Sequence, residues 1–141
     1  MSSLDHRRRP DRIRGTRKYG GVLIVSVTCP GPIGLEFLVD TGAAMTAITP
    51  ATAVALGPSV VRPLRKERIA PVGKALLSAP VVRLQSLQVG GCEVVDLDAL
   101  ILDLPPGLHI DGLLGVNFLE RFRMTIEFDT ATLILRRKRG G

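Results

Sequence analysis

The 141-residue sequence contains no tryptophan, and aromatic residues make up only 4% of it, so its core has to be built from aliphatic side chains. Two cysteines are too few for a disulfide scaffold, and no cysteine–histidine spacing indicates a zinc site. No run of about 18 apolar residues is present, so we expect no membrane insertion. Glycine patterns that bind phosphates or dinucleotides are also missing, and we predict no metal and no cofactor.

Apolar residues nevertheless make up 45% of the chain, and its length is that of one domain. Valine, isoleucine and leucine are concentrated in short segments bounded by glycine and proline, which is typical of β-strands. The strands that we expect are residues 22–29, 34–39, 81–89, 93–102, 124–128 and 131–135. Residues 62–68 are basic and read as irregular, and short helices are predicted at 51–56 and 116–122. The pattern predicts an all-β domain, closed or sandwiched, with one or two short helices.

Charge divides the sequence into three parts. Residues 1–18 carry seven basic and two acidic side chains, residues 136–141 carry four basic ones, and residues 19–135 carry eight basic and eleven acidic ones. We therefore predict a flexible basic tail at 1–19, a domain at 20–135 and a basic tail at 136–141. No apolar segment follows the N-terminal charges, so we expect no signal peptide, a cytoplasmic location and two reduced cysteines.

Asp40 is the strongest candidate for a catalytic residue. It follows the apolar run at residues 37–39 and precedes Thr41 and Gly42. A carboxyl group at the edge of a core is well placed for acid–base chemistry, and a glycine beside it allows a tight turn and the close approach of a ligand. An Asp-Thr-Gly triplet is also compatible with a turn in which the aspartate has only a structural role.

Two longer motifs favour the catalytic interpretation. Residues 37–43 read Phe-Leu-Val-Asp-Thr-Gly-Ala, and residues 110–115 read Ile-Asp-Gly-Leu-Leu-Gly. In this order and spacing they resemble the active-site loop and the second signature of the retropepsin-like aspartic proteases, in particular single-domain bacterial members. The resemblance extends from about Gly20 to Leu135, and it implies a closed or partly closed acid-protease barrel.

The resemblance also implies roles for individual residues. Asp40 would be catalytic, and the active-site loop would be supported by Thr41, Gly42 and Ala43 together with Leu113, Leu114 and Gly115 of the second signature. A flap that covers the substrate would be formed by Ala70, Pro71, Val72, Gly73 and Lys74.

Peptide hydrolysis by this mechanism needs two carboxyl groups on one water molecule. The chain has only one Asp-Thr-Gly, Asp103 and Asp111 stand in a different context, and the length does not allow two lobes. The second Asp40 must therefore come from a second copy, related by two-fold symmetry. We predict a homodimeric aspartic endopeptidase that acts on peptide or protein substrates, and the resemblance implies that Thr41 bonds to the partner's loop.

Some positions depart from the family pattern. Ala44 stands where retroviral enzymes have aspartate, and Val116 where they have arginine, so the contacts of those side chains are not expected here. Two alternatives stay open. One is a non-catalytic peptide-binding or dimerisation module on the same fold. The other is a nucleic-acid-binding protein that uses its basic tails, although we expect no obligate nucleic-acid partner because aromatic residues are not interleaved with the tail charges.

Overall fold

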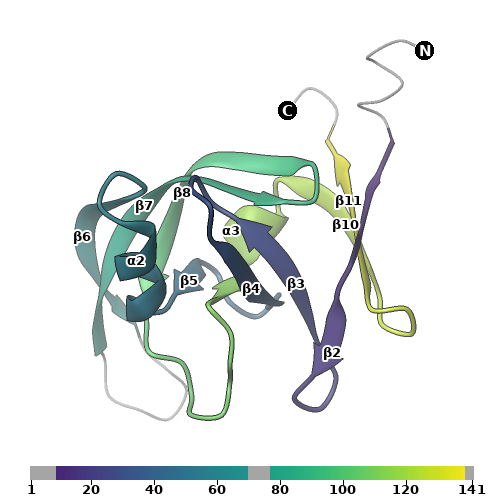
Figure 1. The fold of residues 1–141 in the computed structure, drawn as a ribbon, viewed down its shortest axis with the longest axis horizontal. Helices are drawn as coiled ribbons and strands as arrows, with labels where there is room; N and C mark the ends of the chain where they lie inside the picture. Colours follow the sequence, from purple (N-terminus) through teal and green to yellow (C-terminus); the bar gives the residue numbers. More distant parts are fainter. Residues whose placement is uncertain (1–8, 70–76, 139–141) are drawn as a thin grey trace.

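The computed structural model describes residues 9–69 and 77–138. Strands predominate in it, and two short helices interrupt them (Figure 1). The elements, in chain order, are β1 (Asp11–Arg14), β2 (Thr16–Lys18), β3 (Val22–Thr28), β4 (Gly34–Val39), β5 (Thr46–Ile48), α2 (Pro50–Leu56), β6 (Val61–Ile69), β7 (Leu77–Val89), β8 (Cys92–Ile101), β9 (Gly112–Leu114), α3 (Val116–Leu119), β10 (Phe122–Glu127) and β11 (Thr132–Arg137).

A closed barrel of six strands forms the body of the protein and confirms the predicted all-β class. Its strands lie in the order β3-β4-β9-β5-β8-β7, and a β3–β7 pairing at Thr28 and Gln88 closes the ring. β2 and β6 extend the same sheet beyond β3 and β7. Closure pairs strand edges that would otherwise be open to other chains.

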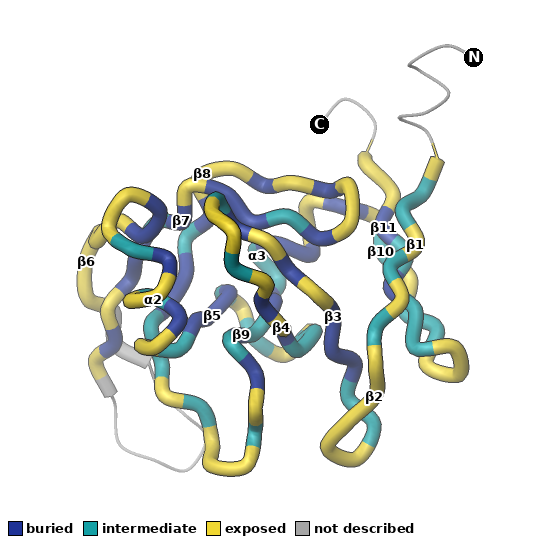
Figure 2. The backbone as a smooth tube through the Cα atoms, viewed as in Figure 1, coloured by how far each residue is buried: buried dark blue, intermediate teal, exposed yellow. Residues whose placement is uncertain are grey.

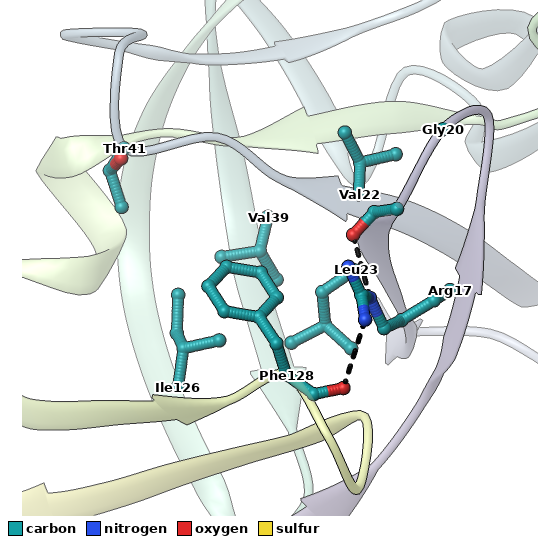
Figure 3. Close-up of a pocket in the computed structure, with 9 residues that line it drawn as sticks. Arg17, Gly20, Val22, Leu23, Val39, Thr41, Ile126 and Phe128 are labelled. Carbon is teal, nitrogen blue, oxygen red and sulfur yellow. Dashed lines mark hydrogen bonds between the residues drawn. The ribbon is translucent and has the colours of Figure 1, made fainter.

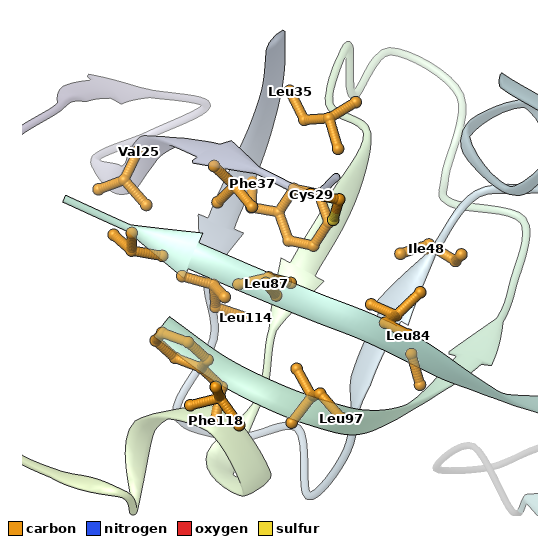
Figure 4. Close-up of a cluster of buried hydrophobic side chains, with 14 of the residues drawn as sticks. Val25, Cys29, Leu35, Phe37, Ile48, Leu84, Leu87, Leu97, Leu114 and Phe118 are labelled. Atoms are coloured by element: carbon orange, nitrogen blue, oxygen red, sulfur yellow. The ribbon is translucent and has the colours of Figure 1, made fainter. Parts of the chain in front are cut away.

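The core inside this barrel is almost entirely aliphatic, as the composition predicts. Alternate residues of β3 and β4 point inward, and their side chains meet those of β7, β8 and the helix α3 (Figure 4). Phe37 and Phe118 are the two fully buried aromatic side chains, and Phe118 packs at 5.3 Å from the ring of Phe122. Burial of these side chains is the main source of stability, because each large apolar side chain contributes about 1.5–3 kcal/mol.

Local sequence signals set several elements where we predicted them. The β3–β4 hairpin turns through residues 30–32, where Gly31 adopts a φ of 118° that other residues rarely allow. Helix α2 begins after Thr49, whose side-chain oxygen accepts a hydrogen bond from the Thr52 amide at 3.1 Å. Proline at the first helical position and Gly57 at the C-cap complete this helix.

The segment 62–68, predicted to be irregular, is instead part of β6. It pairs with β7 along its length, with a register shift between Pro63 and Arg65. Its side chains from 62 to 66 are exposed, because β6 is the edge of the sheet. An edge strand has no apolar alternation to reveal it, and a proline is tolerated there at a bulge.

The predicted tails are also shorter than expected. Residues 11–14 form β1 and pair with β11, residues 16–18 form β2, and β11 continues to Arg137. Ile13 faces the core while Arg12 and Arg14 are exposed, so the strand hides a single apolar contact among arginines. The carboxylate of Asp11 also accepts a hydrogen bond from the Gly91 amide in the β7–β8 turn. The terminal sheet β1-β11-β10 is thereby tied to the barrel (Figure 2).

The second helix ends earlier than the sequence suggested. α3 covers only residues 116–119, because the chain turns at Glu120 and enters β10 at Phe122. Across the described parts of the chain, neither helix has the length and apolar character that crossing a membrane would require.

Candidate active site

Asp40 lies at the point where β4 leaves the barrel. Its amide donates to the carbonyl oxygen of Leu114 at 3.0 Å, and its own carbonyl oxygen accepts from the Ala43 amide at 3.2 Å. The carboxylate oxygen Oδ1 accepts from the Gly42 amide at 2.9 Å. The side chain is half-buried, while Thr41 and Gly42 are exposed. The loop thus holds one oxygen of the carboxylate in place at the protein surface.

Gly42 is required by this geometry. A Cβ atom at this position would stand 3.3 Å from Oδ1 of Asp40, tighter than most such contacts in proteins. A larger residue would therefore push against the carboxylate that the Gly42 amide holds.

The predicted second signature lies directly beside this loop. β9 runs parallel to β4, with Leu38 beside Leu113 and Val39 beside Leu114, and antiparallel to β5. Beyond β9 the amide of Val116 donates to Ala43 at 2.7 Å. The structure therefore brings together residues 40–43 and 113–115, which are about seventy positions apart in the sequence.

A buried hydrogen-bond network beneath the loop was not predicted. Thr46 is completely buried, and its hydroxyl donates to Oδ1 of Asn117 at 2.8 Å and accepts from the Gly115 amide at 3.1 Å. Asn117 also accepts from the Thr46 amide at 2.8 Å and donates to the carbonyl oxygen of Asp98 at 2.7 Å. These bonds join β5, β8, β9 and α3 under the catalytic loop. The sequence signal was a threonine beside an apolar strand and an asparagine after the second signature, which is too weak to identify alone.

The carboxylate of Asp98 is occupied by a second partner. It accepts from Nε of Arg83 at 3.0 Å, and this hydrogen bond, together with the charge of Asp98, raises the pKa of Arg83. The ion pair links β7 to β8 at the residue whose carbonyl oxygen holds Asn117.

Asp111, which the sequence left outside the catalytic motif, has a structural environment. Its carboxylate accepts from the Glu36 amide at 2.8 Å, and its own amide donates to the carbonyl oxygen of Glu36 at 2.8 Å. Its carbonyl oxygen accepts from Thr49 and Thr52 at the start of α2. Asp111 therefore fastens the entry of β9 to β4 and α2.

A small apolar cluster adjoins the loop on the side of β5 and β8. Its buried members are Ala47, Ala79, Val81 and Leu100, and the partly buried Met45, Leu102 and Leu113 pack against it. Met45 follows the catalytic loop in the chain, and Leu113 lies beside Leu38 of β4. Aliphatic surface is thus available next to Asp40.

A pocket of about 390 Å³ opens on another side of the loop (Figure 3). Thr41 and Val39 line it from the loop, and Asp40 between them does not. The pocket is completed by the β2–β3 hairpin and the end of β10, through Arg17, Gly20, Gly21, Val22, Leu23, Ile126 and Phe128. Figure 3 shows the ring of Phe128 in the midst of these side chains.

The other residues considered from the sequence have the following places. Residues 70–74, the predicted flap, lie outside the described residues, although β6 and β7 pair as far as Ile69 and Leu77 on either side of them. The amide of His109 donates to the hydroxyl of Tyr19 at 2.8 Å. Cys29 and Cys92 are buried free thiols, and burial raises the pKa of each to about 11. Within 9–69 and 77–138, no three histidine, cysteine or acidic side chains are grouped to hold a metal ion.

Comparisons with known proteins were made with this geometry established. Residues 25–118 match the sequence model of a protein family described as aspartyl protease, a span that includes both motifs. The fold is similar to the crystal structure of a retropepsin-like aspartic protease from Rickettsia conorii, with a TM-score of 0.63 and 26% sequence identity over 90% of this chain and 91% of that chain. No curated protein matches the sequence.

Proposed function

Because the chain belongs to the aspartyl protease family and has the retropepsin-like fold, we propose that it is a homodimeric aspartic endopeptidase. The observation that carries the proposal is the Asp40 carboxylate. It is held at the surface by the Gly42 amide, on a loop fixed from below by β9. Its substrates are peptides or proteins, and its cytoplasmic location stays a prediction.

The dimer is required by the chemistry. Within the described residues, the other aspartate of the two motifs, Asp111, has its carboxylate engaged with the backbone of β4. The second carboxyl group is therefore the Asp40 of a second copy, brought to the first across a two-fold axis. Two carboxyl groups about 3 Å apart cannot both be ionised, so the pair holds one proton, as is known for aspartic proteases.

The reaction follows from this shared proton. A water molecule lies between the two carboxyl groups, and the ionised one removes a proton from it as it attacks the peptide carbonyl carbon. The protonated carboxyl group gives its proton to the carbonyl oxygen, which forms a neutral tetrahedral intermediate. The carbon–nitrogen bond then breaks, the nitrogen takes a proton from one carboxyl group, and the other recovers a proton from the intermediate. Acid and amine leave, and the dyad again holds one proton.

The surroundings of Asp40 indicate the kind of substrate. The apolar cluster beside the loop, with Met45 and Leu113 partly exposed, favours an aliphatic side chain next to the bond that is cut. Burial of that side chain fixes the peptide relative to the carboxylates. The edge strands that lead into residues 70–76 would pair with an extended peptide as an added strand.

The decisive experiment compares the wild-type protein with Asp40→Asn on a peptide library, read by mass spectrometry from about pH 4 to about pH 7. Asparagine keeps an oxygen that can accept from the Gly42 amide, so the loop is retained, but it cannot act as a base. Asp96→Asn is the matched control, because Asp96 is an exposed residue of β8. We expect cleavage by the wild type and the control only.

Other outcomes have definite meanings. Equal cleavage by the wild type and Asp40→Asn would mean that Asp40 is not catalytic, and the proposal would be wrong. Peptides bound but never cut by a folded dimer would instead support a non-catalytic peptide-binding module on this fold.

A further inference from the structure

The pocket beside Thr41 is an open end of the main core. Val39 and Ile126 pack against the core on one side and line the pocket on the other, and Leu23 beneath them is buried. Phe128 at the rim keeps 50% of its surface exposed. A large aromatic side chain exposed beside an apolar pocket marks a surface that another molecule covers.

Arg17 prepares this aromatic side chain for contact. Its guanidinium lies 5.2 Å from the centre of the Phe128 ring and donates from Nη1 to the Phe128 carbonyl oxygen at 3.4 Å. Its Nε donates to the carbonyl oxygen of Gly21 at 2.9 Å. The arginine thus connects the β2–β3 turn to the end of β10, so less freedom is lost when the rim is covered.

The lining of the pocket argues against a small polar ligand. Arg17 and Thr41 carry its only polar side chains, and the guanidinium already donates to two backbone carbonyl groups. Ligand pockets need several polar groups aimed at one place to fix an orientation. Aromatic and arginine side chains around an apolar centre are instead typical of protein interfaces.

The position of the pocket identifies the partner. Thr41 is the neighbour of Asp40, and the proposed function places two Asp40 residues in contact across a two-fold axis. The surface next to Thr41 therefore lies close to that axis, where the same patch of two identical chains must meet. We propose that this pocket is the contact surface for a second copy of the chain, with Phe128 as its main anchor. This inference rests on the proposed function and adds to it the place at which dimerisation is controlled.

The experiment replaces the anchor and measures the dimer. Phe128→Glu places a charge at the rim, and Val54→Glu is the matched control because Val54 is 83% exposed on α2, on the far side of the molecule in Figure 1. Sedimentation equilibrium gives the dimer dissociation constant, and thermal unfolding checks the fold. We expect Phe128→Glu to raise that constant at least about tenfold, as anchor residues do, and the control to leave it unchanged.

A second measurement needs no mutation. Amide hydrogen exchange of the wild type is compared at concentrations above and below the dissociation constant. We expect protection to increase with concentration at residues 20–22 and 126–128, which border the pocket. This result holds even if the variant does not fold.

The outcomes separate this inference from the proposed function. A wild type that stays monomeric at every concentration, an unchanged dissociation constant in Phe128→Glu, or concentration-independent exchange at the pocket would overturn the inference. If the dimer is weakened but the wild type cuts no peptide, the contact surface stands and the peptidase proposal fails. If Asp40-dependent cleavage occurs and Phe128→Glu dimerises normally, the peptidase stands and the surface is wrong.

Discussion

Replacement of Thr46 by valine tests the buried network beneath the catalytic loop. Valine has nearly the same shape as threonine, so the change removes a hydroxyl group and little volume. In the structure that hydroxyl donates to Asn117 and accepts from the Gly115 amide, and Thr46 is completely buried. Water therefore cannot replace the lost partner without a rearrangement of the loop.

The magnitude follows from the two bonds. A buried Gly115 amide left without an acceptor costs about 1–3 kcal/mol, and loss of the bond to Asn117 costs about 0.5–1.5 kcal/mol. Asn117 keeps the Thr46 amide as a donor, so it is not left empty. We therefore expect the free energy of unfolding to fall by about 2–4 kcal/mol, and the melting temperature by about 2–5 °C for each kcal/mol.

The assay is chemical denaturation of wild type, Thr46→Val and the matched control Thr125→Val. Thr125 is exposed on β10, so its replacement should change stability by less than about 0.5 kcal/mol. A Thr46 variant as stable as the control would refute the reasoning, because it would show that the network does not hold the loop segments together. Activity should also fall, since the network fixes the segments that carry Asp40.

Two further predictions concern glycine and cysteine. Gly112→Ala should destabilise the fold by about 3 kcal/mol or more, because an added Cβ would overlap the Ala47 carbonyl oxygen and the Phe37 ring; Gly34→Ala, with open space at its Cβ, should unfold like the wild type in the same denaturant series, and equal loss in both would contradict the packing argument. Cys29 and Cys92 should resist a thiol reagent at about pH 8 until the protein unfolds, because burial raises the pKa of both thiols to about 11. The folded state favours the neutral thiols, so stability should be full below about pH 9 and decline as the pH rises towards 11, and urea titrations that show no decline would contradict this.

Local chemistry explains which elements the sequence predicted well. The β3–β4 hairpin follows from alternating aliphatic residues and a Pro-Gly-Pro turn, and α2 follows from Thr49, Pro50 and Gly57. Each of these signals acts within a few residues, so a single sequence displays it. The aliphatic core and the all-β class follow from composition for the same reason.

The wrong predictions share the opposite property. β6 and β1 are sheet edges rich in basic residues, and neither shows the apolar alternation by which strands are recognised. They are strands because distant strands, β7 and β11, offer them backbone partners. Pairing of that kind depends on the tertiary arrangement and overrides local propensity.

The candidate site divides in the same way. The sequence alone determined that one Asp-Thr-Gly loop follows a buried strand, that a Leu-Leu-Gly segment stands about seventy residues later, and that a single chain supplies one such aspartate. The tertiary structure alone decided that Thr46 lies on Asn117, 71 positions away, and that Thr41 borders a pocket closed by Phe128. Contacts over such separations are set by how the barrel closes, and no local pattern of side chains records them.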